Sequence, residues 1–230
     1  MLIRPSSYDM RTQRQEPLLI PYNPTLDSLD LEEAGNALEE LGVRLSVESL
    51  NWPAAFPYRP LTVITAAHSN RFLYLDFLVR CNYLRAVNFT DNTPVSEDSC
   101  VEFYVQPRPD EDEYWALEFN CVGTLNALKC RGVGECSHLS ETEMQSIRRY
   151  ASVGTRPFQE VEGSFIWSVV VAIPLSLFDM EYIGQPIEMK GNFNKCASAT
   201  SQPHYLSWAP INSPAPDFHR PDCFGTITLV

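Results

Sequence analysis

The chain has 230 residues, 44% of them hydrophobic and 20% charged, and its formal net charge is −12. This length favours one large domain with a substantial core. The acidic balance argues against nucleic acid and anionic membranes as partners, because both bind surfaces rich in Lys and Arg. No run of about 18 apolar residues occurs, so the sequence predicts no membrane-spanning helix. The first residues lack the apolar stretch of a secretory signal, so we expect a cytoplasmic protein.

Residues 1–42 are expected to form an extension that packs on the main domain. Four prolines within residues 1–26 predict extended or loosely held chain. A short amphipathic helix follows, with Ser28 or Asp30 as its N-cap and Gly42 as its end. Its apolar positions recur at helical spacing, at Leu31, Ala34, Leu38 and Leu41.

From residue 43 onward the apolar residues alternate with polar ones, as in half-buried strands. The expected strands are 43–48, 61–67, 72–80, 84–89, 99–106, 114–120, 122–129, 164–172, 187–195 and 223–229. A helix-like stretch covers 141–149, and the proline-rich segment 198–221 is predicted to be a long ordered loop. About ten strands without regular helices between them indicate an all-β fold, an antiparallel β-sandwich over residues 43–230.

The seven cysteines are an odd number without paired C-x-x-C spacing, so we expect reduced thiols. Cys100 and Cys121 lie in apolar strands, where a free thiol behaves as a small hydrophobe. Cys130 and Cys136 flank a glycine-containing loop and can pair if the protein is exported.

Glu102 is an acidic residue inside an apolar alternating strand. Burying an isolated carboxylate costs several kcal/mol or more, so this side chain needs water, a partner or a ligand. Glu118 lies on a strand that can neighbour it, and two carboxyl groups at a suitable spacing form the acid–base pair of a glycoside hydrolase. We favour the alternative of a polar sheet face, or of ion pairs with Arg85 and Lys195. The sequence contains no nucleotide-binding or serine-hydrolase fingerprint.

His204 and His219 share the C-terminal loop, and with Asp217 or Asp222 they are candidate ligands of a transition metal. Their spacing does not match a metal motif. We therefore expect these histidines to stack or to form hydrogen bonds.

The C-terminal part of the chain carries the mixture of side chains that sugar recognition requires. Flat aromatic rings cover the apolar faces of a pyranose, while amide, carboxyl and basic groups bind its hydroxyls. Trp208 lies in a polar loop bounded by proline, so burial in the core explains it less well than it explains Trp167. The residues that supply this mixture are Asn192, Asn194, Lys195, His204, Tyr205, Trp208, Phe218, His219 and Arg220.

Five ordered motifs together resemble the family 9 carbohydrate-binding modules, in the form of the stand-alone proteins common in gut Bacteroidetes. They cover residues 98–104, 118–124, 191–196, 203–211 and 216–221, before a final strand that begins at Phe224. The resemblance spans residues from about 45 to 230.

This resemblance implies a β-sandwich of the DOMON-like type that holds a sugar between two aromatic rings, with a carboxylate and amides on the hydroxyls. Structural calcium is also implied as possible. By motif, Glu102 matches the carboxylate and Trp208 one ring. The position of the second ring, six residues before the Glu, is Ser96, so Tyr104, Tyr205 or Phe218 must replace it if the clamp is kept.

We therefore predict a non-catalytic binder of a small saccharide or a sugar chain end, without a known protein partner. The expected ligand-binding residues are Glu102, Asn120, Asn192, His204, Tyr205, Trp208, His219 and Arg220. Three alternatives stay open. They are a hydrolase that uses Glu102 and Glu118, an interaction scaffold whose sugar site has decayed at Ser96, and a haem protein with Met180, Met189 and His204 as ligands.

Overall fold

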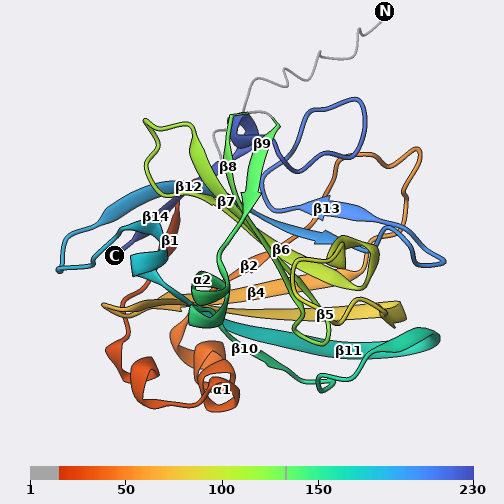
Figure 1. Cartoon of the computed structure of the whole chain (residues 1–230), viewed down its shortest axis with the longest axis horizontal. Helices are drawn as coiled ribbons and strands as arrows, with labels where there is room; N and C mark the ends of the chain where they lie inside the picture. The colour runs from red at the N-terminus through yellow and green to blue at the C-terminus, as the bar shows by residue number, and fades with distance from the viewer. Residues whose placement is uncertain (1–15, 133) are drawn as a thin grey trace, which may run out of the picture.

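The computed structural model describes residues 16–132 and 134–230. Two stacked β-sheets form the body of the protein, as the sequence predicted (Figure 1). Two α-helices, α1 (Leu31–Leu41) and α2 (Glu141–Ser146), lie outside the sheets. Short 3-10 turns cover Pro24–Ser28, Val95–Glu97, Leu175–Phe178 and Pro221–Cys223. No helix in the described part of the chain has the length and apolar character needed to cross a membrane.

The smaller sheet is antiparallel throughout and lies between α1 and the larger sheet (Figure 1). Its strand order is β10 (Arg148–Ala151), β11 (Phe158–Pro174), β5 (Phe72–Ala86), β4 (Leu61–His68) and β2 (Val43–Ser46). The expected strands 72–80 and 84–89 are one continuous strand, because β5 pairs with β11 along nearly its whole length.

The larger sheet has nine strands. Its main order is β1 (Leu18–Ile20), β14 (Gly225–Leu229), β12 (Ile187–Cys196), β6 (Cys100–Gln106), β7 (Glu113–Asn120), β8 (Leu125–Arg131) and β9 (Glu135–His138). Two short strands branch from β12, namely β13 (Tyr205–Ser207) and β3 (Ser49–Leu50). β1 runs parallel to β14, and the other described pairings are antiparallel.

The main core lies between the two sheets and is rich in aromatic rings. Phe77 of β5 contacts Phe119 and Phe193 of the larger sheet, with 6.4 Å between ring centroids in each pair. Phe103 stacks on Phe193 at 4.8 Å. These contacts bury the inward face of every second residue along the strands, which is the alternation that the sequence shows.

Helix α1 packs on the outer face of the smaller sheet. Asp30 is its N-cap, because the Asp30 side chain accepts from the Glu33 N–H and the Glu33 side chain accepts from the Asp30 N–H. Gly35 allows a close approach, since a Cβ there would lie 2.7 Å from a methyl group of Val170. The predicted helix and its end at Gly42 are therefore confirmed.

The extension before α1 is better held than its prolines suggested. β1 joins the larger sheet, so residues 18–20 are part of the sandwich rather than loose chain. The expectation for residues 1–15 lies outside the described residues.

The oxidation state of the cysteines differs from the expectation for one pair. Cys130 and Cys136 form a disulfide across the β8–β9 hairpin. The expectation that all thiols are reduced is wrong for this pair, because the hairpin register places the two side chains opposite each other. The free cysteines are Cys81, Cys100, Cys121, Cys196 and Cys223.

Loops cover the outer face of the larger sheet and build a second, smaller core there. Trp52, from the loop after β3, donates its ring N–H to the carbonyl of Ser213, in the loop after β13. Phe218 of that same C-terminal loop lies near Trp52, with ring centroids 6.1 Å apart. The blue C-terminal loops run on this side of the larger sheet in Figure 1. An incompletely covered part of this face is where a ligand can reach the strands.

Candidate functional site

Three adjacent strands place polar side chains at one level of the larger sheet. Glu102 of β6 is paired with Glu118 of β7 and with Asn194 of β12. Because side chains alternate along a strand, Glu102 and Tyr104 share the outer face, whereas Phe103 points into the core. A cleft of about 270 Å³ opens above them. Its lining residues are Ser96, Glu102, Tyr104, Glu118, Cys196, Ser198, Tyr205, Pro216, Asp217, Phe218 and His219.

Glu118 is the centre of a hydrogen-bond network in the cleft. The Tyr104 hydroxyl donates to Glu118 Oε1 at 2.9 Å, and the Asn126 amide donates to Oε2 at 3.0 Å. His219 closes the network, with its Nε2 3.4 Å from the Tyr104 hydroxyl and its Nδ1 3.0 Å from the Tyr114 hydroxyl. These bonds fix the orientation of the carboxylate and the imidazole before a ligand arrives.

Glu102 is more deeply buried than Glu118 and has weaker partners. Its Oε2 accepts from the Asn194 amide at 3.2 Å, and its Oε1 lies 3.0 Å from Cys196 Sγ. Burial raises the pKa of Glu102 well above its usual range, and the nearby Cys196 and Glu118 add to this effect. A neutral carboxyl group can donate a hydrogen bond as well as accept one, which suits a hydroxyl-bearing ligand.

Aromatic side chains form one wall of the cleft. Tyr205 lies edge-on to Phe56, with ring centroids 4.8 Å apart, and 6.1 Å from Phe218. Ser96 also lines the cleft and brings no ring to it. The cleft therefore combines hydrogen-bonding groups on its floor with an apolar aromatic surface at its side.

The match to a family model covers most of the chain. Residues 36–229 match the family described as carbohydrate-binding family 9. The chain belongs to carbohydrate-binding family 9. It is a carbohydrate-binding module on a β-sandwich, as the motifs indicated. No curated protein matches the chain.

Solved structures agree with this assignment. A proposed carbohydrate-binding protein from Bacteroides uniformis is 32% identical to this module, with a TM-score of 0.86 over 93% of this chain and 99% of that one. A family 9 module from Caldicellulosiruptor kristjanssonii in complex with glucose is 13% identical, with a TM-score of 0.56 over 94% and 96%. The same source gives a complex with cellotriose, 12% identical with a TM-score of 0.54 over 93% of each chain. These two share the fold with the module.

Three of the residues expected to bind sugar line the cleft, namely Glu102, Tyr205 and His219. Tyr104 and Glu118, which were considered only as a replacement ring and a hydrolase carboxylate, also line it. Their signal was in the sequence, because strand alternation places Tyr104 on the same face as Glu102. Ser198 and Asp217 line the cleft from loops, where alternation gives no guide.

Asn120 is fully occupied by the protein and does not reach the cleft. Its amide donates to the carbonyl of Asn88 at 2.7 Å and to Asp98 Oδ2 at 3.0 Å. Its Oδ1 accepts from the backbone of Val122 and Thr124, which fixes the turn after β7. Asn120 thus holds this turn against the strand.

Asn192 and Trp208 also have structural contacts instead of cleft positions. Asn192 makes two hydrogen bonds with the backbone of Ala209, at 3.0 and 2.9 Å, and is fully buried. The Trp208 ring lies edge-on to Phe193 of the main core at 5.9 Å. The ring is half-buried in this position and does not line the cleft.

His204 and Arg220 lie outside the cleft as well. His204 is buried beside Tyr58, with its Nδ1 2.8 Å from the carbonyl of Gln202, and burial holds the pKa of its imidazole well below the usual range. Arg220 makes a two-pronged ion pair with Asp222, with N–O distances of 2.8 and 2.7 Å.

The ion pairs considered for Glu102 and Glu118 go to other partners. Arg85 pairs with Asp98 at 2.5 Å. Lys195 is buried on the core side of β12, donates to the carbonyl of Cys196 at 2.7 Å, and lies 5.7 Å from the Trp167 ring. The strand register places Glu102, Glu118 and Asn194 together on the outer face of the larger sheet, which is the polar sheet face that we favoured over a hydrolase pair.

Two groups of three potential metal ligands occur among the described residues. One is Cys130, Cys136 and His219, in which the two cysteines already form a disulfide, and the other is Cys100, Glu102 and Cys196. Calcium takes six to eight oxygen ligands, so neither group fits it, and structural calcium stays a prediction without assigned residues.

The transition-metal and haem alternatives find no shared site among the described residues. His204 and His219 have different partners, as given above. Met189 lies in the main core, and Met180 lines a different pocket.

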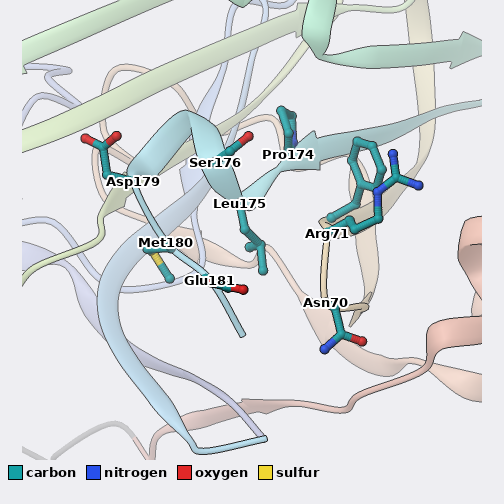
Figure 2. Close-up of a pocket in the computed structure, with 9 residues that line it drawn as sticks. Asn70, Arg71, Pro174, Leu175, Ser176, Asp179, Met180 and Glu181 are labelled. Atoms are coloured by element: carbon teal, nitrogen blue, oxygen red, sulfur yellow. The ribbon is translucent and has the colours of Figure 1, made fainter. Parts of the chain in front are cut away.

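That other pocket is the larger one, about 630 Å³ (Figure 2). Asn70 and Arg71 lie on one side of it and Asp179 and Met180 on the other (Figure 2). None of the residues expected to bind sugar lines it. Its lining includes Arg71, Asp179 and Glu181, but it lies away from the sheet face that carries Glu102, Tyr104 and Glu118.

Proposed function

We propose that the module binds one neutral sugar unit, free or at a chain end, in the cleft on the outer face of the larger sheet. The observation that carries this proposal is the combination of Glu118, Tyr104 and His219 with the aromatic wall of Tyr205 and Phe218 around one cleft. Carboxylate, phenol and imidazole groups bind hydroxyls, and the rings cover C–H surfaces. Drug-sized ligands fill sites of about 300–1,000 Å³, so the cleft suits a single ring better than a long chain. Glucose and cellotriose in complexes of the related modules support the same ligand class.

Binding without hydrolysis is supported by how the two carboxyl groups are arranged. Glu102 and Glu118 stand on neighbouring strands and rise from the same sheet face. In glycoside hydrolases the two carboxyl groups flank the bond that is cleaved. Side chains that approach a sugar from one side are suited to holding its hydroxyls.

Isothermal titration of the full chain with glucose and cellotriose tests the proposal. We expect saturable binding that Glu118→Gln weakens by roughly 10–100-fold, since hydrogen bonds to a charged group contribute about 1.5–3 kcal/mol. Arg220→Ala is the matched control, because this side chain pairs with Asp222 outside the cleft. Absence of binding by the folded protein would favour the scaffold alternative. Release of glucose from cellotriose that Glu118→Gln abolishes would favour the hydrolase.

A further inference from the structure

A second set of donor atoms lies at the base of the cleft. Cys100 of β6 and Cys196 of β12 are direct cross-strand partners, and Glu102 follows Cys100 by two residues on the same face. The two Sγ atoms and a carboxylate oxygen of Glu102 all lie within 4.8 Å of one another. Cys196 Sγ is 3.0 Å from Glu102 Oε1. All three residues are at most 1% exposed.

These donors match the ligands of zinc-class cations. Such ions bind cysteine sulfur at about 2.3 Å and carboxylate oxygen at about 2.0–2.2 Å in a tetrahedral arrangement. Ligand atoms around one ion are then about 3.4–3.8 Å apart. The observed cluster is close to this spacing, so movements of about 1 Å or less bring its three atoms around one ion. Two thiolates select soft cations over magnesium or calcium.

Glu102 has no ion pair in residues 16–132 and 134–230, although the buried Lys195 acts through space on both cysteines of this cluster. Lys195 directs its ammonium group to the other side of β12. Asn194, whose amide donates to Glu102, has an Oδ1 without a hydrogen-bond partner among the described residues. A buried polar group without a partner is costly. Few protein hydrogen bonds therefore have to be broken when an ion binds beside Asn194 and Glu102.

An ion can reach the cluster through the cleft. Glu102 and Cys196 both line the cleft, and Cys100 is the cross-strand neighbour of Cys196 on the same face. A fourth ligand position therefore faces the cleft, where a water molecule can occupy it. This is the open-position arrangement in which three protein ligands leave one site for an exchangeable molecule.

We propose that Cys100, Cys196 and Glu102 bind a thiophilic divalent cation of the zinc class at the base of the cleft. Coordination releases the two thiol protons and the proton of the Glu102 carboxyl group to solvent and involves no change of oxidation state. The ligands differ from the sugar-facing network of Glu118, Tyr104 and His219, so metal binding can be measured in the absence of sugar, although both sites open into the same cleft.

Titration of the metal-free full chain with cadmium, without reductant, tests the site. Cadmium–thiolate bonds give an ultraviolet charge-transfer band, and we expect one equivalent to saturate it and zinc to displace it. Cys196→Ser should abolish the band or weaken binding by at least the 10–100-fold that loss of an outer-shell partner costs. Cys81→Ser is the matched control, because Cys81 is a buried free thiol on β5, outside the cluster, where it donates to the carbonyl of Tyr83 on the same strand.

Two further variants make the result decisive. The double variant Cys130→Ser/Cys136→Ser removes the disulfide beside His219, and with it any thiol that reduction would release there, and should keep the band. Glu102→Gln preserves the shape of the side chain and should keep the band at lower affinity, which covers the case that Cys196→Ser does not fold. No stoichiometric band, or a band that survives in Cys196→Ser and Cys100→Ser, would overturn the proposal.

Discussion

Tyr205 and Phe218 hold their rings at 61° to each other, with centroids 6.1 Å apart, on the wall of the cleft. Rings in this arrangement contact each other instead of facing each other across a gap. Ser96 lines the cleft where the family resemblance implies a second ring. The cleft therefore has a single aromatic wall, and a sugar that enters it meets aromatic surface on one side.

The aromatic wall makes Tyr205 the ring whose loss should weaken sugar binding most clearly. We expect Tyr205→Ala to lower the affinity for glucose roughly tenfold, because an aromatic contact contributes about 0.5–1.5 kcal/mol beyond its buried area. Tyr205→Phe should keep most of the affinity, since the ring remains. Isothermal titration measures both. Equal affinity of Tyr205→Ala and the unmodified protein would mean that the sugar does not touch this wall.

Trp208 should matter for stability and not for sugar affinity. Its ring packs on Phe193 beside the main core, so we expect Trp208→Ala to lower the free energy of unfolding by about 2–4 kcal/mol. Urea denaturation followed by circular dichroism measures this loss. A variant that is as stable as the unmodified chain but no longer binds glucose would contradict this prediction and show that Trp208 contacts the sugar.

The charges of the cleft should exclude acidic sugars. Glu118 and Asp217 line it, and no Lys or Arg is among the described lining residues. A uronic acid would bring its carboxylate close to these groups. We expect glucuronate to bind at least tenfold more weakly than glucose at pH 7, with a difference that shrinks at high salt. Tighter binding of glucuronate would show that a cation outside this lining takes part.

Asp76 should make stability depend on pH. Burial raises the pKa of Asp76 to about 6, with Glu39 adding to the effect and Arg44 opposing it. Because the folded form holds its proton more tightly than the unfolded form, stability is highest at low pH in this range and falls as pH rises from about 4 to 6. Asp76→Asn should therefore gain about 1–3 kcal/mol at pH 7 and nothing at pH 3.5. Denaturant titrations at the two pH values check this, and a gain that is equal at both would contradict it.

Gly35 sets how closely α1 approaches the smaller sheet. A Cβ at this position would lie 2.7 Å from Val170 Cγ2, so Gly35→Ala should push the helix outward. We expect a net loss of about 1–2 kcal/mol, because overpacking exceeds the gain of about 1 kcal/mol in helix propensity. Thermal unfolding measures it. Asn36→Ala on the exposed side of the same helix is the control and should not destabilise the protein.

The fold was predictable because its signals are local. Alternation of apolar residues gave the strands, and Asp30 and Gly42 marked the ends of α1. β1 was not predicted, since three residues after a proline carry too little pattern to indicate a parallel partner at the other end of the chain.

The candidate site was only partly predictable, because exposure in a loop is decided by tertiary contacts. Trp208 and Arg220 look like sugar ligands in sequence. In the structure the Trp208 ring packs on Phe193, and Arg220 forms an ion pair with Asp222. Asn120 lies in one of the motifs that resemble the family, but its side chain is hydrogen-bonded to the turn that follows it. Glu102 was found because burying a carboxyl group inside an apolar strand is costly whatever the conformation of the surrounding loops.

The two borders of the larger sheet are short. β1 has three residues and covers the side of β14, while β9 has four and is tied to β8 by the Cys130–Cys136 disulfide. An exposed strand edge offers unpaired N–H and C=O groups to which another chain can add, and the risk grows with the length of the edge. Strands this short offer a neighbouring molecule few such groups. The nine-stranded sheet is therefore protected at both edges against edge-to-edge association with other copies of the protein.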